Sequence, residues 1–394
     1  MQSGKSYHYY RVFAAACVGM LLFGIVMLSL GSTLPEITRK YQLDDVSAGS
    51  LASLLPTGIL VGSLIFGPIV DRFSYKYLLV LCSVIIAIGM GGIASASGLF
   101  FLQLSFFLIG FGGGAINGGT NALVADISHD HQKTGSANLS LLGVFFGVGA
   151  LSMPSVMAML SKWYPYDQIL LGIGAVIMIP ALFFFTINYP EPKQKQSVSI
   201  VKSASLFKDQ SLLILAFVLF FQSAFEGIFN NWTTTYLQRI RGFSESEALT
   251  VLSIYVIGLT ATRLLLAGLL RTISEKLVLY LSICSLILGV CGLMIFHDII
   301  AVYFVAAVLG IGTAAVFPTI LGFVGELYQK LRGTAFSVVF FIAVFGNILV
   351  NFLVGLLSEK MGISRYPSIL LGVVIMILVV FTIYDRSSRK GSRH

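Results

Sequence analysis

Long apolar runs follow one another along almost the whole chain, and they limit its fold more than any other feature. They cover approximately residues 12–34, 49–70, 77–98, 100–126, 135–160, 167–188, 211–237, 246–270, 277–296, 299–324, 333–357 and 366–384. Each run is long enough to cross a hydrocarbon core of about 30 Å as a helix. Only 11% of the residues are charged, which excludes an ordinary soluble domain. The sequence therefore predicts an all-α membrane protein with twelve transmembrane helices.

One longer loop divides the runs into two sets of six. We expect an N-terminal half over 1–188, a cytoplasmic linker over 189–210, a C-terminal half over 211–386 and a basic tail over 387–394, whose last four residues we set aside as an expression remnant. Most Lys and Arg residues fall in segments on the same side as the N-terminus, which predicts that both termini are cytoplasmic. This placement explains the net charge of +8 without a nucleic-acid partner.

The two halves repeat each other at an offset of about 200 residues. Gly110-Phe111-Gly112 matches Gly310-Ile311-Gly312, and Asp126 matches Glu326. Two six-helix halves with the same orientation are parallel repeats about an axis along the membrane normal. In that arrangement a solute binds near the midplane, between the halves.

The segment from Gly67 to Lys76 carries the first resemblance to a known family. It reads Gly, then Asp71-Arg72, then the basic residue Lys76, and it resembles the loop between spans 2 and 3 of the major facilitator superfamily. The resemblance covers the whole chain and implies the major facilitator fold.

Charges at the cytoplasmic ends of the helices can pair when the cytoplasmic face of the transporter closes and separate when it opens. We predict a cytoplasmic gate from Asp71, Arg72, Lys76, Asp126, Arg263, Arg271, Glu326 and Arg332. The alternative is that these charged residues only set the orientation of the helices in the membrane and form no gate.

Glu226 is the only Asp or Glu near the middle of an apolar run. A carboxylate at that depth costs several kcal/mol unless it is paired, solvated or protonated. If it gains and loses a proton as the cavity opens and closes, it carries one H⁺ per cycle; if it stays ionised, it can help to hold Na⁺. The alternative is a permanently protonated or hydrogen-bonded Glu that only holds its helix in shape.

Amide side chains in the runs are the candidate ligands of a polar solute. Gln222, Glu226 and Asn230 share one helical face, whereas Asn231 and Trp232 join it only if the helix bends near or beyond Gly227. The predicted solute-binding residues are Asn117, Asn121, Gln222, Glu226, Asn230, Asn231, Trp232, Asn347 and Asn351. The alternatives are that the amides hold helices together and that the Trp is an interfacial belt residue.

A narrower resemblance rests on three short motifs. Glu226, Trp232 and Tyr236 resemble span 7 of the fucose–galactose–glucose:proton symporter family and of related sodium-dependent glucose transporters. The run from Gly112 to Asn121 resembles the family's span 4, and Phe145 to Ala150, followed by Pro154, resembles its span 5. The resemblance implies transport of a sugar.

The chain departs from that family at its charged positions. Asn117 stands where the family carries an acid in span 4, and residues 31–35 are uncharged where the fucose permease branch has an Asp in span 1. Ser140 and Gly143 stand where the family has Asn and His. These departures leave Glu226 as the mid-span carboxylate that can couple transport to an ion.

We therefore expect a secondary active transporter of a small polar solute, a sugar or sugar derivative, coupled to H⁺ or Na⁺ by alternating access. The alternatives are an exporter of amphiphilic compounds or drugs and an uncoupled facilitator. No Walker A motif, catalytic constellation or Cys-x-x-Cys spacing occurs, so we expect no enzyme, no cofactor and no metal site. The short 189–210 loop argues against a sensor with a cytoplasmic domain. We expect a monomer in the lipid bilayer of a bacterial inner membrane, without a nucleic-acid partner.

Overall fold

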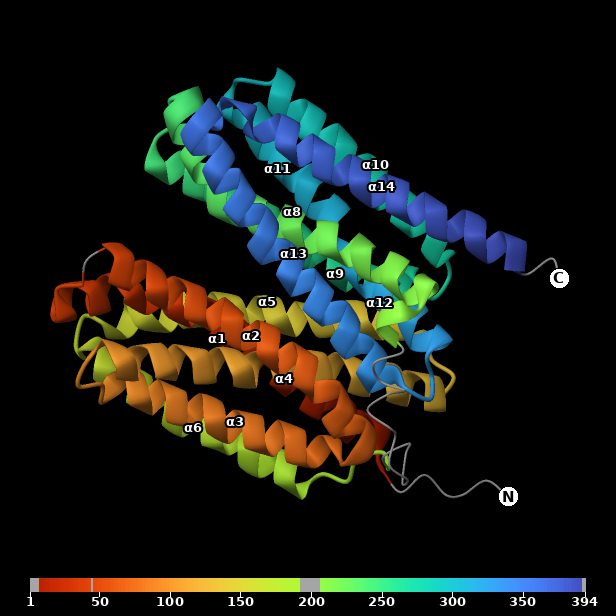
Figure 1. Ribbon diagram of the computed structural model, residues 1–394, viewed down its shortest axis with the longest axis horizontal. Helices are drawn as coiled ribbons and strands as arrows, with labels where there is room; N and C mark the ends of the chain where they lie inside the picture. Colours follow the sequence, from red (N-terminus) through yellow and green to blue (C-terminus); the bar gives the residue numbers. More distant parts are fainter. Residues whose placement is uncertain (1–6, 44, 192–205, 392–394) are drawn as a thin grey trace. The chain divides into compact units, whose positions relative to one another are not determined.

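The computed structural model describes residues 7–43, 45–191 and 206–391, and these residues are helical without a β-strand (Figure 1). The α-helices are α1 (Tyr9–Tyr41), α2 (Asp45–Arg72), α3 (Tyr75–Ala94), α4 (Leu99–Asp130), α5 (Gly135–Leu160), α6 (Tyr166–Thr186), α8 (Gln210–Arg241), α9 (Glu245–Leu269), α10 (Glu275–Ile295), α11 (Ile299–Ala314), α12 (Val316–Leu327), α13 (Arg332–Met361) and α14 (Tyr366–Gly391). Two short 3-10 helices, η1 (Leu206–Lys208) and η2 (Ile363–Arg365), precede α8 and α14. In the described ranges, 12 spans are long and apolar enough to cross a membrane, which confirms the predicted fold class.

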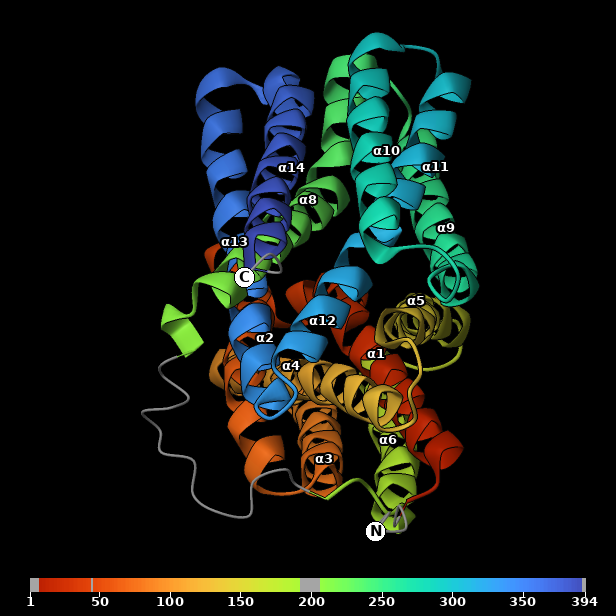
Figure 2. The same cartoon turned by 90° about the vertical axis from the view of Figure 1, so that its right-hand side faces the viewer.

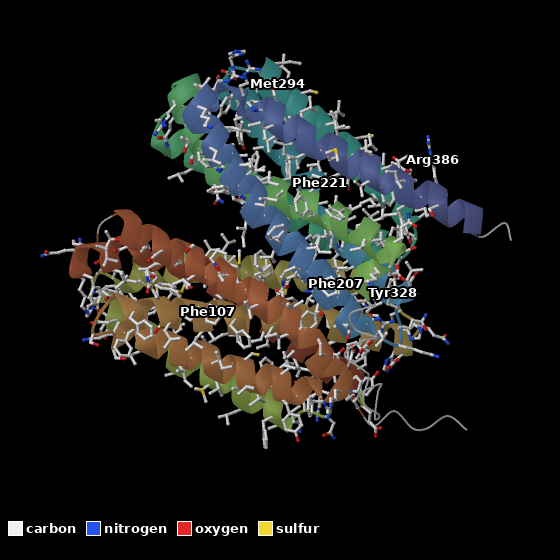
Figure 3. All side chains as sticks on the ribbon, in the orientation of Figure 1. Phe107, Phe207, Phe221, Met294, Tyr328 and Arg386 are labelled. Carbon is white, nitrogen blue, oxygen red and sulfur yellow. The ribbon has the colours of Figure 1, made fainter. Side chains whose placement is uncertain are left out.

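Apolar side chains cover the outer faces of these helices. Leu81, Ile88 and Phe304 are among many large hydrophobic residues that remain exposed. Figure 3 shows that the oxygen and nitrogen atoms of the side chains gather mainly near the ends of the helices. Exposed apolar surface of this extent is unfavourable in water and favourable against lipid.

The chain forms two compact units, which are described separately. Unit 1 comprises Met1–Lys133, Phe145–Ser203 and Tyr328–Phe341, and unit 2 comprises Thr134–Val144, Ala204–Leu327 and Ile342–His394. The units differ from the expected halves at two helices: the first turns of α5 belong to unit 2, and those of α13 belong to unit 1. Residues 192–205 of the expected linker and 392–394 of the expected tail lie outside the described residues, whereas α14 continues to Gly391.

Each unit has the same pattern of neighbouring helices. In unit 1, α2 packs along α4, and α3 packs against α4 and α6. In unit 2, α9 packs along α11, and α10 packs against α11 and α14 (Figure 2). The equivalent pairs are therefore α2 with α9, α3 with α10, α4 with α11 and α6 with α14.

Glycine contacts show that the repeat extends to single residues. A Cβ at Gly110 would strike the backbone carbonyl of Leu55, and a Cβ at Gly310 would strike that of Tyr255. Gly310 and Tyr255 thus stand about 200 residues after Gly110 and Leu55, and the two pairs make the same contact. The same offset relates the contacts of Gly58 and Gly258, Gly89 and Gly289, and Gly112 and Gly312. Small residues at these positions let the paired helices approach closely.

Two helices differ in continuity from what their sequences suggest. The expected single run 299–324 is divided after Ala314, because Pro318 has no N–H to donate to the carbonyl of Ala314. In contrast, α8 is one helix from Gln210 to Arg241 and passes through Gly227 without an interruption.

Candidate functional site

Glu226 lies halfway along α8, in unit 2. Asp209 caps the N-terminus of α8, where the side chain accepts a hydrogen bond from the N–H of Leu212, and Gly242 caps its C-terminus with a positive φ of 71°. This helix of 32 residues carries Glu226 to the middle of a predicted span. The Glu226 side chain is 31% exposed, so it is only partly buried.

Only one carboxylate oxygen of Glu226, Oε1, has a hydrogen-bond or ion-pair partner among the described residues. The Gln222 Nε2 donates to Glu226 Oε1 over 3.0 Å, and Arg263 Nη2 lies 3.9 Å from the same oxygen. Gln222 Nε2 also lies 3.4 Å from the carbonyl oxygen of Thr313. Among the described residues, the other oxygen, Oε2, has no hydrogen-bond partner.

Two buried atoms beside this carboxylate lack hydrogen-bond partners among the described residues. They are the acceptor Gln222 Oε1 and the donor Arg263 Nε, on side chains that are 0% and 7% exposed. A buried polar atom left without a partner costs about 1–3 kcal/mol. Such atoms are normally satisfied by water or a ligand. The site therefore holds unused capacity to bind both a donor and an acceptor.

The position of Arg263 differs from the expected one. We predicted that it joins the charged helix ends of a cytoplasmic gate, but the structure places it next to Glu226, well inside α9. The available signal was that Arg263 is a basic residue inside an apolar run and Glu226 an acidic one. Opposite charges buried in a membrane pair with each other because isolated charges there are costly.

The two predicted amides of α13 bond to each other and to α8. Asn351 Nδ2 donates to the Asn347 carbonyl over 2.9 Å, and Asn347 Nδ2 donates to the Ser223 carbonyl over 2.9 Å. Asn231 Nδ2 donates to Asn351 Oδ1 over 3.1 Å. A Cβ at Gly227 would overlap both amides of α13, so this glycine makes room for the network. These bonds fit the alternative in which amides hold helices together.

The remaining predicted solute ligands lie on α8 in unit 2 and on α4 in unit 1. Asn230 is exposed, and Trp232 is half-buried with its ring near Gly355 of α13. In unit 1, Asn121 Nδ2 donates to the carbonyl and Oδ1 of Asn117, at 2.8 and 3.1 Å, and both amides are buried. The two asparagines of α4 thus satisfy each other in the same way as the pair on α13.

Two residues of this site were not predicted from the sequence. The Tyr255 hydroxyl donates to Thr313 Oγ1 over 3.3 Å, and its ring centroid lies 4.4 Å from that of Phe229. Tyr255 precedes Arg263 by about two helical turns, so both lie on one face of α9. The spacing of Tyr255 from Arg263 along α9 is the signal in the sequence that could have identified Tyr255.

Three of the predicted gate residues come together in unit 1. Asp71 accepts hydrogen bonds from the N–H groups of Gly333 and Thr334, at 3.2 and 2.8 Å, and from the Thr334 hydroxyl. These groups form the first turn of α13, where the positive end of the helix dipole favours a carboxylate. Asp126 accepts from the Tyr75 hydroxyl over 2.7 Å and pairs with the buried Arg332. The Asp71, Asp126 and Arg332 side chains therefore hold the start of α13 in unit 1.

The other predicted gate residues lie outside that cluster. Arg72 is exposed, with its guanidinium 5.4 Å from the Phe73 ring centroid, and the Lys76 ammonium lies 5.3 Å from that of Phe185. Arg271 and Glu326 are exposed residues of unit 2.

A second helix-start contact was not predicted. In unit 2, the hydroxyl of Ser136, at the start of α5, donates a hydrogen bond to Glu275, at the start of α10. Ser136 and Thr334 are equivalent in the internal repeat, since Gly135-Ser136-Ala137 matches Gly333-Thr334-Ala335. Each unit therefore has an acidic residue that binds the first turn of the helix shared with the other unit. The equivalence of these two contacts could not be predicted from the sequence, because the residue that matches Asp71 is Arg271. The acid that binds the first turn of α5 in unit 2 is instead Glu275.

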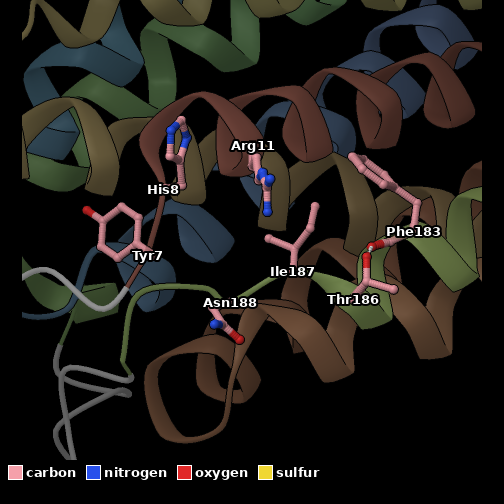
Figure 4. Close-up of a pocket in the computed structure, with 7 residues that line it drawn as sticks. All are labelled: Tyr7, His8, Arg11, Phe183, Thr186, Ile187 and Asn188. Carbon is pink, nitrogen blue, oxygen red and sulfur yellow. Dashed lines mark hydrogen bonds between the residues drawn. The ribbon is translucent and has the colours of Figure 1, made fainter.

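A cavity of about 400 Å³ opens at the N-terminal end of α1 and the C-terminal end of α6 (Figure 4). It is lined by Tyr7, His8, Arg11, Phe183, Thr186, Ile187 and Asn188. The Tyr7 hydroxyl donates to Asp130 over 2.8 Å, and burial together with this bond raises the pKa of Tyr7 above its usual range. None of these residues belongs to the predicted solute site, and the cavity lies at helix ends rather than at mid-span depth.

The described residues contain no group of three or more His, Cys, Asp or Glu side chains that could hold a metal ion. All four cysteines are free thiols in this structure.

Comparisons with known proteins agree with this architecture. A family model, the Major Facilitator Superfamily, matches residues 16–350. The Glucose/mannose transporter GlcP of Bacillus subtilis is 24% identical, over 84% of each chain. The 3-(3-hydroxy-phenyl)propionate transporter of Escherichia coli is 24% identical, over 94% of this chain and 92% of its own. Among solved structures, FucP in the outward conformation has a TM-score of 0.77 at 17% identity, covering 95% of this chain and 97% of FucP. The chain therefore belongs to the major facilitator superfamily and is a multi-pass membrane transporter.

Proposed function

We propose that this protein is a secondary active transporter of a small neutral polyol, a sugar or sugar derivative, which it couples to H⁺ through Glu226. The observation that carries the proposal is the unfilled hydrogen-bonding capacity around Glu226. Gln222 Oε1 and Arg263 Nε are buried without partners, and Glu226 Oε2 is also unpaired within the described residues. An ionisable group at mid-span depth can carry the coupling proton, and unpartnered polar atoms beside it can bind a solute.

The pattern of vacant atoms supports a hydroxylated solute. One vacant atom is a donor and two are acceptors, and a hydroxyl group both donates and accepts. The charges of Glu226 and Arg263 offset each other, so a neutral solute enters without leaving a net charge in the site. An aromatic acid, such as the one named for the Escherichia coli relative, would add a second negative charge beside Glu226.

The neighbouring guanidinium supports H⁺ rather than Na⁺ as the coupling ion. Arg263 lies 3.9 Å from Glu226, and a bound Na⁺ would experience its repulsion at short range. A proton instead neutralises the carboxylate and needs no further oxygen ligands. Protonation also weakens the pair with Arg263, which links the charge of Glu226 to the shape of the site.

The helix-start contacts of Asp71, Asp126 and Arg332 support the proposed gate. They join distant parts of the chain through charged bonds that can break and re-form as a unit changes shape. The distribution of Lys and Arg supports a cytoplasmic location of both termini, and hence of this gate. We further propose that the protein acts as a monomer in a bacterial inner membrane.

A thermal-shift screen of the purified protein tests the solute class. The probes are D-glucose, D-mannose, L-fucose, D-xylose, benzoate and a lipophilic cation, each at two pH values with and without Na⁺. We expect at least one sugar to raise the melting temperature, more strongly at the lower pH and without a response to Na⁺. The Gln222→Leu variant should lose this shift, whereas Glu247→Gln, a substitution in the capping box at the start of α9, should keep it. Stabilisation by benzoate or the cation alone would overturn the sugar assignment.

A further inference from the structure

The first turns of α5 face the buried Arg263 through one row of residues. Ser136, Ser140 and Gly143 lie at the spacing i, i+4 and i+7, which places them on one helical face. The Ser140 hydroxyl donates to the backbone carbonyl of Arg263 over 2.7 Å. One turn later, Gly143 lies directly against the Arg263 side chain. All of these residues belong to unit 2.

A side chain at Gly143 would lie against the guanidinium group, over the part that carries Cδ and Nη1. A Cβ at Gly143 would lie 2.9 Å from Arg263 Cδ, 3.0 Å from Nη1 and 3.3 Å from Cζ. In arginine, Cδ and Nη1 share one edge of the planar group, and Nε and Nη2 share the opposite edge. The Nε/Nη2 edge carries Nη2, which is 3.9 Å from Glu226, and Nε, which has no hydrogen-bond partner among the described residues.

This geometry leaves the ion pair open. A closed pair between arginine and a carboxylate has two parallel hydrogen bonds of about 2.7–2.9 Å. Here the Nε/Nη2 edge that could form them stands back from Glu226, because the absence of a side chain at residue 143 lets the guanidinium group occupy that space. A closed pair would hold Glu226 ionised and would satisfy both Arg263 Nε and Glu226 Oε2.

We infer that Gly143, on a helix anchored by Ser140, is a positioning residue that keeps the Glu226–Arg263 pair open, so that Glu226 can exchange a proton and a solute hydroxyl can enter. This inference rests on the proposed function, since it assigns Gly143 a role in the same site. Because α5 continues from unit 2 into unit 1, the inference also makes the state of the ion pair depend on how the first turns of α5 are docked.

The pH dependence of chemical labelling at Glu226 tests whether the Glu226–Arg263 pair is open, and it requires no solute. Dicyclohexylcarbodiimide reacts with protonated carboxyl groups in apolar surroundings, and mass spectrometry quantifies its adduct on Glu226. The titratable groups that act on Glu226 are Arg263 and Tyr255, both on α9; within the described residues, α12, α13 and α14 bring no charged group to it. The full-length protein in liposomes is compared with Gly143→Ala and with Gly268→Ala, whose added methyl group meets open space on α9.

In Gly143→Ala the methyl group should push the guanidinium toward Glu226 and close the pair. The labelling profile should then move to lower pH by about one unit, while Gly268→Ala leaves it unchanged. In an Arg263→Ala background, Gly143→Ala should have no further effect, because the group it displaces is absent. An unmoved profile, a move to higher pH, or the same move without Arg263 would overturn the inference.

Two further results distinguish a failure of the role of Gly143 from a failure of the variant to fold and from a failure of the proposed function. If Gly143→Ala does not fold, the double variant with Arg263→Ala should fold, since it removes the clash; a double variant that also fails contradicts the inference. If Glu226→Gln retains proton-driven accumulation, the proposed function fails. If that variant loses accumulation but the labelling profile of Gly143→Ala does not move, only the role of Gly143 fails.

Discussion

At the level of single residues, the two buried arginines illustrate different uses of a paired charge. Arg332 is 2% exposed and is in direct contact with Asp126, which also binds the Tyr75 hydroxyl. Arg263 is 7% exposed, and its only ion pair in the described residues is the longer one with Glu226. The first arrangement suits a structural contact, whereas the second leaves capacity for a ligand.

Replacing Arg332 should therefore reduce stability. Arg332→Ala removes the positive charge paired with the buried Asp126, and loss of one partner of a buried pair costs about 3–5 kcal/mol. We expect a clear fall in the melting temperature of the purified protein, and a smaller fall for Arg332→Lys, which keeps the charge. Arg72→Ala, at an exposed position, provides the matched control. Equal melting temperatures for Arg332→Ala and Arg72→Ala would contradict the structural role of Arg332.

The sequence identified the charged residues better than their partners. Glu226, Asp71 and Asp126 stand out because acids are costly in or beside apolar runs. Their partners Arg263 and Thr334 lie on other helices, and a single sequence gives the position of a residue along its helix but not which neighbour it faces. For the same reason, the sequence placed Asn117 and Asn121 one turn apart but did not show that they are buried.

At the level of helices, close packing through glycine is the most regular feature. The contacts of Gly110 on α4 and Gly310 on α11 are equivalent, and in both the neighbouring atom is a backbone carbonyl. A backbone atom cannot rotate away as the end of a side chain can. These glycines therefore set how closely α4 approaches α2 and how closely α11 approaches α9.

Alanine at either glycine should separate its helix pair. We expect Gly110→Ala and Gly310→Ala each to destabilise the protein by about 1–3 kcal/mol, the usual cost of overpacking. Gly172→Ala on α6 adds the same methyl group in open space, so it should be neutral or slightly stabilising through its higher helix propensity. Melting temperatures of the three variants measured side by side test this, and indistinguishable values would contradict the packing argument.

Helix positions were predictable, but their continuity was not. The apolar runs located all twelve spans because the membrane imposes length and hydrophobicity. The interruption after Ala314 depends on Pro318, yet α2, α5 and α6 also contain proline and remain continuous. At Gly227 the helix is not interrupted, and Asn347 and Asn351 of α13 occupy the space that this glycine leaves.

At the level of the whole molecule, the two units do not coincide with the two halves of the sequence. The long loop and the internal offset predicted a division at 189–210, and the equivalent contacts of Gly110 and Gly310 fit that repeat. The assignment of the first turns of α5 and α13 to the other unit depends on contacts such as Ser136 with Glu275 and Thr334 with Asp71. Contacts between residues so distant in the chain follow from tertiary packing, which hydropathy does not report.

The central claim is that Glu226 couples solute movement to a proton gradient, and transport by Glu226→Gln tests it most directly. Proteoliposomes are loaded with the sugar identified in the thermal-shift screen, and accumulation driven by an imposed proton gradient is compared with exchange at equal pH. Gln keeps the size and hydrogen bonding of Glu but cannot ionise, so the variant should lose accumulation and retain exchange, while Glu247→Gln retains both. Accumulation by Glu226→Gln at the level of the unmodified protein would contradict the account.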